Sequence, residues 1–333
     1  MSLILNPLSK DLVVAKPIEQ IAAERLQELE SDNRLIIERK RNGHAALLAI
    51  AGPGLSEIGI YSRSIQDLSE RFVSQRELLR AMEIPAGTLL KAEQTCAVDG
   101  IEKPGIITRF AGSKPERSLA LQTEFGGATL ALFDVLLHKG ESAAHLPYED
   151  RLDIVANICA RSQSSQIELV EVLEMSAKNA QQKSLAEKWE GLVFYDKQAA
   201  TDFRNDGRHD YPPRPDGCWK WKDYLEGDFV AIGWRPSTSK RFAGMVKDVL
   251  IAQYHPDYPG ELVPCGKVGV GLTTAERQEY TDDSLYPMVF EIKYETRTEN
   301  NRLISARIMR RRTDKAPSEC IGPPLTDITK AAT

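Results

Sequence analysis

The sequence predicts an α+β fold with antiparallel sheets, followed by a smaller unit that is built almost entirely from short strands. Up to about residue 227, segments with a three- to four-residue apolar period alternate with segments of period two. Beyond that point nearly every apolar segment has period two. The 333 residues, 42% hydrophobic and 27% charged, are typical of a soluble globular chain with one large or two ordinary domains.

The first hundred residues show both periods. Apolar residues recur at helical intervals over residues 13–31, which predicts an amphipathic helix. The period changes to two over residues 35–38, 46–50 and 58–61, and we expect these segments to form an antiparallel meander with a turn at Gly43.

The remaining elements of the larger unit follow from the same periods. The pattern predicts helices at residues 65–82, 148–160 and 176–189, and strands at residues 88–98, 128–137 and 191–195. Residues 205–217 are rich in turn-forming residues and poor in apolar ones, so we expect a surface loop there.

The smaller unit has the pattern of a compact all-β domain. Strands are predicted at residues 228–234, 244–252, 262–271, 288–296 and 303–309, with one short helix at 274–280. Five strands in such a short segment fit an OB-type β-barrel, and a sandwich is the alternative. We therefore divide the chain into domains at residues 1–223 and 224–318, with a flexible tail at 319–333.

The composition narrows the class of protein. No apolar run reaches the length of a membrane span and the N-terminus has no signal-peptide pattern, so we expect a cytoplasmic monomer that does not bind membranes. The five cysteines are scattered and never spaced Cys-x-x-Cys, which argues against a disulfide framework or a zinc site. The net charge is −5, but basic residues gather at 220–247 and 307–315, where they could contact nucleic acid.

Lys40 is the first candidate for chemistry, because it lies between an alternating apolar run and the turn at Gly43. Further short motifs follow it in a fixed order: Tyr61-Ser62-Arg63, Lys91-Ala92-Glu93-Gln94, Leu132-Phe133-Asp134-Val135-Leu136, Glu190-Gly191-Leu192-Val193, Trp219-Lys220-Trp221-Lys222 and Arg312-Thr313-Asp314-Lys315. This ordered set, from about residue 34 to 316, resembles the motifs of the ATP-dependent DNA ligases, which are covalent nucleotidyltransferases.

The first motif departs from the family pattern at two positions. The usual Lys-x-Asp-Gly-x-Arg reads Lys40-Arg41-Asn42-Gly43-His44-Ala45, so Asn42 stands for Asp and Ala45 for Arg. Asparagine keeps the turn-forming geometry of aspartate but removes its charge. Some RNA ligases also lack this Asp, which leaves an RNA substrate open.

The resemblance implies a role for each motif. Lys40 would attack the α-phosphorus of ATP and carry AMP, while Lys220 and Lys222, two apart in a strand and so on one face, would hold the α-phosphate. Arg312 and Lys315 would orient the departing pyrophosphate, which requires the C-terminal domain to move.

The same resemblance assigns nucleotide and metal ligands. Glu190 and Glu93 would bind Mg²⁺, whose preferred ligands are carboxylate and phosphate oxygens. Phe133 would stack on adenine, Glu38 would accept a hydrogen bond from the adenine amino group, and Arg63 would contact the nucleotide and the 5′-phosphate.

The resemblance thus implies a ligase-type nucleotidyltransferase domain followed by an OB-fold domain. The function expected is an ATP- and Mg²⁺-dependent DNA ligase that seals nicks in duplex DNA during repair or replication. An RNA ligase or capping-type guanylyltransferase is the rival enzyme. A non-catalytic OB-fold protein that only binds nucleic acid is a rival of another class.

Overall fold

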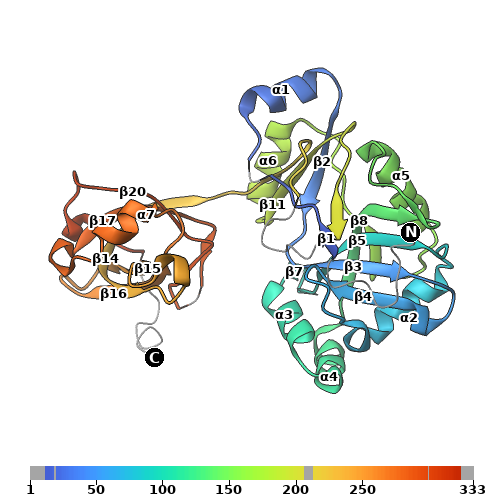
Figure 1. Cartoon of the computed structure of the whole chain (residues 1–333), viewed down its shortest axis with the longest axis horizontal. Coiled ribbons are helices and arrows are strands. Elements are labelled where there is room, and N and C mark those ends of the chain that lie inside the picture. Colours follow the sequence, from blue (N-terminus) through green and yellow to red (C-terminus); the bar gives the residue numbers. More distant parts are fainter. Residues whose placement is uncertain (1–11, 19, 206–212, 299, 324–333) are drawn as a thin grey trace. The chain divides into compact units, whose positions relative to one another are not determined.

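A computed structural model describes residues 12–18, 20–205, 213–298 and 300–323 of the chain (Figure 1). The chain divides into two compact units, residues 1–222 and residues 223–333, and each unit is described by itself. None of the helices in the described ranges is both long and apolar enough to cross a bilayer.

The larger unit is built around a mixed sheet with the strand order β10-β8-β5-β3-β4, in which β9 also pairs with β8. Its strands are β3 (His44–Ile50), β4 (Ile58–Ser62), β5 (Thr88–Thr95), β8 (Thr129–His138), β9 (Glu141–Ser142) and β10 (Ile167–Leu169). All pairs are antiparallel except β8 with β10.

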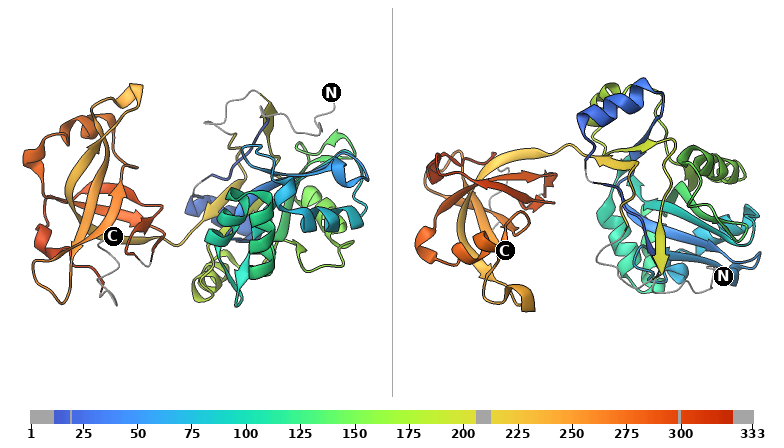
Figure 2. Two further views of the ribbon diagram at one scale, coloured as in Figure 1. Left: turned by 90° about the horizontal axis from the view of Figure 1, so that it is seen from below. Right: turned by 45° about the horizontal axis from the view of Figure 1, so that its top comes forward.

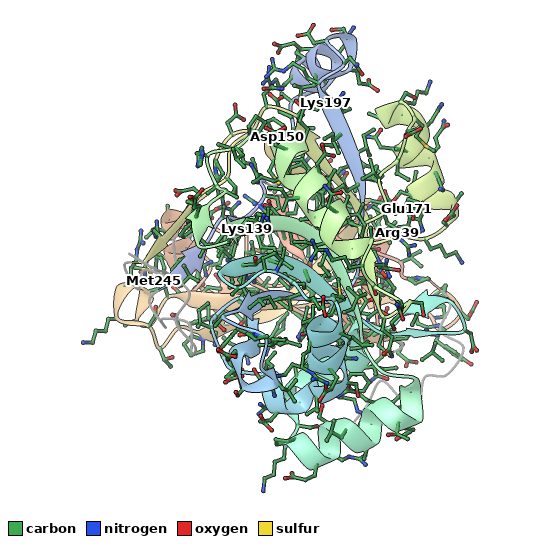
Figure 3. The ribbon with its side chains drawn as sticks, turned by 90° about the vertical axis from the view of Figure 1, so that its right-hand side faces the viewer. Arg39, Lys139, Asp150, Glu171, Lys197 and Met245 are labelled. Atoms are coloured by element: carbon green, nitrogen blue, oxygen red, sulfur yellow. The ribbon has the colours of Figure 1, made fainter. Side chains whose placement is uncertain are left out.

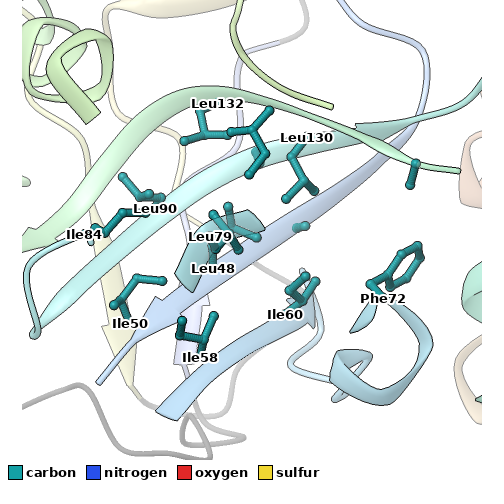
Figure 4. Packing of buried hydrophobic residues seen from close by; sticks show 14 of the residues in the cluster. Leu48, Ile50, Ile58, Ile60, Phe72, Leu79, Ile84, Leu90, Leu130 and Leu132 are labelled. Carbon is teal, nitrogen blue, oxygen red and sulfur yellow. The ribbon is translucent and has the colours of Figure 1, made fainter. Parts of the chain in front are cut away.

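One face of this sheet forms the main core. Alternate residues of the central strands, such as Leu48, Leu90 and Leu130, are fully buried and pack together (Figure 4). The helices α2 (Val73–Ala81), α3 (Pro104–Gly112) and α4 (Pro115–Phe125) cover this face, and α3 and α4 lie side by side (Figures 1 and 2).

A second, three-stranded sheet has the order β13-β11-β2 and is antiparallel throughout. Its strands are β2 (Leu35–Lys40), β11 (Gly191–Asp196) and β13 (Cys218–Trp221). A further core cluster joins this sheet to residues of α1 (Ala23–Ser31) and α6 (Ala177–Ala186).

The other elements of the larger unit are short or peripheral. They are β1 (Leu12–Val14) paired with β12 (Phe203–Asn205), the hairpin of β6 (Ala97–Val98) and β7 (Ile101–Glu102), and the 3-10 helices η1 (Leu55–Glu57) and η2 (Ser69–Arg71). The helix α5 (Tyr148–Cys159), in contrast, contributes Val155 and Ile158 to the main core.

Three expectations for this unit were wrong in part. The helix predicted over residues 13–31 begins only at Ala23, because Leu12–Val14 pairs with β12 and Pro17 disfavours a helix. The predicted meander forms only in part: β3 pairs antiparallel with β4, but β2 pairs with β11, a partner about 150 residues away, rather than with β3. The helix predicted over residues 65–82 is confined to Val73–Ala81.

The smaller unit contains one antiparallel five-stranded sheet in the order β16-β15-β14-β17-β20. Its elements are β14 (Leu225–Pro236), β15 (Val246–Tyr254), β16 (Leu262–Val268), β17 (Met288–Tyr294), β20 (Arg307–Arg311), the pair β18 (Thr296–Arg297) and β19 (Leu303–Ile304), α7 (Thr274–Glu279), η3 (Lys240–Phe242), η4 (Asp283–Leu285) and η5 (Pro317–Glu319). Within the described residues no pairing joins the edge strands β16 and β20, so a closed barrel is not found.

The start of the predicted tail is packed. Cys320 is only 1% exposed, its carbonyl accepts a hydrogen bond from the Tyr254 amide at 2.8 Å, and the Gly322 amide donates to the Tyr254 carbonyl at 2.9 Å. Backbone pairing along the end of β15 therefore holds this segment, contrary to the flexibility expected from residue 319. Residues 324–333 lie outside the described residues.

Candidate active site

The two sheets of the larger unit border a cavity of about 270 Å³. Its lining includes seven of the predicted site residues: Glu38, Lys40, Arg63, Glu93, Phe133, Lys220 and Lys222. They come from strands of both sheets or from the residues just after a strand, so the cavity depends on how the sheets meet.

Lys40 and Lys222 share one carboxylate, that of Glu190. The Lys40 Nζ atom lies 2.6 Å from Glu190 Oε2, and the Lys222 Nζ atom lies 2.7 Å from Glu190 Oε1. All three side chains are largely buried, with exposed fractions of 21%, 9% and 17% for Lys40, Lys222 and Glu190. In a partly desolvated site such contacts are stronger than on an open surface.

Strand register produces this arrangement. Gly191 of β11 lies opposite Lys40 of β2, and Leu192 lies opposite Trp221 of β13. Glu190 therefore enters between the ends of the two outer strands. Gly191 has φ = 145°, and a Cβ atom there would lie 2.1 Å from the Trp221 carbonyl oxygen, so the position requires glycine.

Glu38 lies deep in the cavity, with 2% of its surface exposed. The Tyr148 hydroxyl donates a hydrogen bond to Glu38 Oε1 and lies 2.9 Å from the Phe133 carbonyl oxygen. Burial raises the pKa of Glu38 to about 8, despite the opposing effects of Tyr148 and Lys91. The carboxyl group of Glu38 is therefore mainly protonated at neutral pH.

Phe133 and Asp134 are neighbours on β8, and both line the cavity. Phe133 is half-buried and lines the cavity, with the Lys91 ammonium 5.2 Å from its ring centroid. Asp134 is 1% exposed and accepts hydrogen bonds from Arg151 Nε at 2.7 Å and Lys91 Nζ at 3.1 Å. This buried ion pair anchors the strand that presents the phenyl ring.

Glu93 on β5 is the second acidic residue near the Lys40 end of the cavity. Its pKa is raised to about 7, chiefly by burial and to a smaller extent by the charge of Glu190, while the charge of Lys40 opposes this shift. Two interacting carboxylates beside a cavity suit a hard cation, whose charge would relieve their repulsion. No cluster of three or more acidic, histidine or cysteine ligands occurs among the described residues, so a cation here would need ligands from a phosphate group and water.

Arg63 and Lys16 are among the further basic residues that line the cavity. Arg63 follows β4 and is exposed, while Lys16 follows β1 and is half-buried. Burial lowers the pKa of Lys16, and the charges of Arg63 and other neighbouring cations lower it further. This part of the cavity thus carries positive charge.

The strand that carries the nucleophile candidate, β2, is held by contacts with neighbouring segments. The Arg39 amide donates to the Glu171 carbonyl at 2.9 Å, and Arg39 Nη1 lies 3.7 Å from Glu171 Oε2. Both residues are labelled in Figure 3. The Arg39 guanidinium also lies 4.8 Å from the centroid of Trp189. These contacts fix the end of β2 just before Lys40.

Arg312 and Lys315 belong to the smaller unit. Both contact Asp228 on β14, with Lys315 Nζ at 2.7 Å and Arg312 Nη1 at 3.2 Å, and Arg312 also contacts Asp314 at 2.9 Å. The Asp314 and Asp228 carboxylates raise the pKa of the Arg312 guanidinium. The structure thus brings these two predicted residues together with each other.

Some cavity residues were not assigned a role from the sequence. Lys16, Lys91, Asp134, Tyr148 and Arg151 line the cavity or contact residues that do. Their positions depend on pairings between distant segments, such as Lys91 opposite Asp134 across β5 and β8. In the sequence, the signal for such a role was modest. It consisted of a basic residue, Lys91, and an acidic residue, Asp134, at central positions of otherwise apolar strands.

Comparison with known proteins agrees with these observations. A DNA ligase of Thermococcus fumicolans is 25% identical over 283 residues, which cover 80% of this chain and 47% of that protein. The chain thus spans about half the length of this curated relative.

Solved structures share the fold. A structure from a structure-function study of DNA binding by Lig E DNA ligases has a TM-score of 0.61 at 16% identity, covering 90% of this chain and 99% of the other. The ligase domain of M. tuberculosis LigD has a TM-score of 0.51 at 18% identity, covering 94% and 99%. At these identities the likeness concerns the fold.

The family assignment rests on a longer stretch of sequence. The family model for the ATP dependent DNA ligase domain matches residues 13–210. This range includes the whole main sheet, strands β2 and β11 of the second sheet, and most of the cavity residues. This match covers more than half of the chain. The chain therefore belongs to the ATP-dependent DNA ligase domain family.

Proposed function

We propose that this protein is an ATP-dependent DNA ligase that seals nicks in duplex DNA through a lysyl-AMP intermediate. The observation that carries this proposal is the cluster of Lys40, Glu190 and Lys222 beside a cavity that also contains Glu38 and Phe133. At one end of the cavity the candidate nucleophile Lys40 lies near other basic side chains. At the other end lie the aromatic ring of Phe133 and the carboxyl group of Glu38. This is the pattern that a nucleoside triphosphate requires.

The first step is adenylylation of Lys40. The unprotonated amine attacks the α-phosphorus of ATP, a P–N bond forms, the bond to the bridging oxygen breaks, and pyrophosphate leaves. Glu190 Oε2, 2.6 Å from Nζ, is placed to accept the proton that the amine must lose. Lys220 and Lys222 hold the α-phosphate, where negative charge develops.

The base is recognised at the buried end of the cavity. Phe133 stacks on adenine. Because Glu38 carries a proton and is fixed by Tyr148, its carboxyl group can both donate to and accept from the adenine edge. This extends the sequence-based expectation, in which Glu38 was only an acceptor.

Glu93 and Glu190 would hold Mg²⁺. When bound, the cation would neutralise the triphosphate charge and polarise its phosphorus. Arg63 contributes a fork of donors for the nucleotide and for the 5′-phosphate of the nick.

In the remaining steps AMP passes from Lys40 to the 5′-phosphate, and the 3′-hydroxyl then attacks that phosphate and releases AMP. We propose that the smaller unit is an OB-type domain, supported by its five antiparallel strands with α7 between the third and fourth. Arg312 and Lys315 of this unit orient the pyrophosphate during the first step.

The direct test uses ATP labelled at the α-phosphate. After incubation with Mg²⁺, the label should remain on the denatured protein, and the Lys40→Ala variant should take up none. The matched control is Lys178→Ala, at an exposed position of α6. Absence of label on the wild-type protein, or equal labelling of Lys40→Ala, would reject the lysyl-AMP mechanism.

RNA is the second candidate substrate, because Asn42 replaces the aspartate that DNA ligases usually have after the nucleophile. Labelled enzyme should be given nicked DNA and nicked RNA of the same sequence in parallel. Faster sealing of the RNA nick would identify an RNA ligase.

A further inference from the structure

Glu102 lies on β7, about sixty residues from the turn that follows Lys40, yet its side chain contacts that turn directly. Its Oε2 atom accepts a hydrogen bond from the Asn42 amide at 2.8 Å. Its Oε1 atom accepts one from Arg41 Nε and lies 3.9 Å from Arg39 Nη2. The Glu102 side chain is only 8% exposed, so these contacts are largely shielded from water.

We propose that Glu102 is a positioning residue for Lys40: it supplies, from another strand, the negative charge that this chain lacks at position 42. The inference rests on the proposed lysyl-AMP function. A carboxylate at position 42 would lie within the turn itself, whereas Glu102 reaches the same backbone from the β6–β7 hairpin.

The hairpin is well placed to act as a support. It follows β5 closely, precedes α3, and is closed by a hydrogen bond of 2.8 Å from the Lys103 amide to the Cys96 carbonyl. The chain contributes to the main core on both sides of the hairpin, since Cys96 just before it and Ile107 of α3 are buried. Glu102 is therefore held by rigid structure on both sides.

The turn it contacts joins the two sheets at the cavity. Lys40 ends β2 of the three-stranded sheet, and His44 begins β3 of the main sheet. Gly43 approaches β5 so closely that a Cβ atom would lie 2.0 Å from the Gln94 carbonyl oxygen. With the far end of the turn fixed at Gly43, the Glu102 contacts at Arg41 and Asn42 fix the near end and hence the approach of the Lys40 amine.

Glu168 on β10 provides a matched control. It also accepts a hydrogen bond from the Arg41 guanidinium, but its side chain is 37% exposed and Glu102, not Glu168, bonds to the Asn42 amide. Replacing Glu168 by Gln removes one charge beside Arg41 and leaves the backbone contact intact. Comparing Glu168→Gln with Glu102→Gln therefore separates the effect of removing a charge beside Arg41 from the effect of removing the contact with the turn.

The experiment measures the single-turnover rate of covalent label uptake from saturating ATP, and the dissociation constant for a non-hydrolysable ATP analogue. Glu102→Gln should label about tenfold to a hundredfold more slowly, because small errors in the placement of a nucleophile have effects of this size. Its affinity for the analogue should stay within about twofold of wild type, since the turn is not assigned a contact to the base. Glu168→Gln should label at nearly the wild-type rate.

The decisive variant is Asn42→Asp in the Glu102→Gln background, which returns a carboxylate to the turn. It should recover much of the lost rate, whereas Asn42→Asp alone should gain nothing, because two acidic groups would then compete at one place. A merely structural role for Glu102 predicts no such rescue. If Glu102→Gln fails to fold, Glu102→Asp is measured instead. Its carboxylate is one methylene too short for the 2.8 Å contact with the Asn42 amide, so it should label more slowly than wild type, and a wild-type rate would overturn the positioning role.

Each result decides between named possibilities. A wild-type rate for Glu102→Gln, or an equal loss for Glu168→Gln, would overturn the positioning role while leaving the lysyl-AMP mechanism in place. Absence of label on the wild-type protein would instead reject the proposed function itself.

Discussion

The Lys40 amine and the Glu190 carboxylate lie 2.6 Å apart although 150 residues separate them in sequence. The antiparallel pairing of β2 with β11 places Lys40 opposite Gly191, so the residue just before that glycine meets the lysine side chain. Lys222 reaches the same carboxylate at 2.7 Å from beyond the end of β13. The three strand ends thus form one small cluster of charges.

Lys222→Ala should slow label uptake by about a hundredfold, since it removes a phosphate contact in a shielded site and alters the charge balance at Glu190. Single-turnover labelling at saturating ATP measures this. Lys188→Ala, an exposed lysine just beyond α6, is the control and should label normally. Normal labelling of Lys222→Ala would show that Lys222 takes no part in the first step.

Glu38→Gln should change how stability depends on pH. The native carboxyl group, with its pKa raised from 4.5 to about 8, keeps its proton where the unfolded chain has lost it. Unfolding therefore releases a proton between these values, and the stability of the wild type falls as pH rises from 4.5 to 8 because of this group. Glutamine cannot ionise, so the free energy of unfolding of the variant should not fall with pH through this group.

The test compares the free energies of unfolding of wild type and Glu38→Gln in urea at pH 5, 7 and 9. The variant should gain relative to wild type with rising pH, by an amount on the order of a few kcal/mol at pH 9, and the gain should level off above pH 8. Glu187→Gln, at the exposed end of α6, serves as a control. A difference that is constant with pH would show that Glu38 ionises normally.

Phe133→Leu should weaken ATP binding by about threefold to tenfold, because aromatic stacking contributes roughly 0.5–1.5 kcal/mol beyond the burial of area. Leucine keeps the position apolar, and Phe133→Tyr keeps the ring and should bind almost normally. Equilibrium titration with a non-hydrolysable analogue provides the measurement. Equal affinities for the leucine and tyrosine variants would argue against stacking.

Arg312→Ala should slow Lys40 labelling by about two to three orders of magnitude, since the pyrophosphate would no longer be held for departure. Arg310→Ala is a matched control, since Arg310 lies on β20 two residues before Arg312, is exposed and contacts Glu291. If both variants label at the wild-type rate, the smaller unit has no part in the first step.

Lys40→Ala should still seal a nick that already carries AMP on its 5′-phosphate, because the last step needs phosphate contacts but no bond to the lysine. Sealing is followed by gel separation of the joined strand. A double variant, Lys40→Ala with Lys220→Ala, should seal more slowly, as Lys220 lines the same cavity. Complete inactivity of Lys40→Ala on this substrate would give Lys40 a role beyond carrying AMP.

Much of the local structure could be predicted from the sequence, because it depends on short-range periodicity. The strands at Leu35–Lys40, Thr129–His138 and Gly191–Asp196 and the helix at Tyr148–Cys159 lie where apolar spacing predicted them. The helices α3 and α4 were not predicted, although each begins with a proline that is favourable at the first helical turn.

The candidate site was predicted in its residue types but not in its contacts. Order along the chain singled out Lys40, Glu190 and Lys222, and no local pattern could show that one carboxylate serves both lysines. Three features arise from pairing between distant segments. They are the placement of β2 and β3 in different sheets, the burial that raises the pKa of Glu38, and the contact of Glu102 with the Asn42 amide. Sequence determines which chemical groups are available, whereas distance, dielectric environment and charge sharing are decided by tertiary structure, because each depends on partners that only folding brings together.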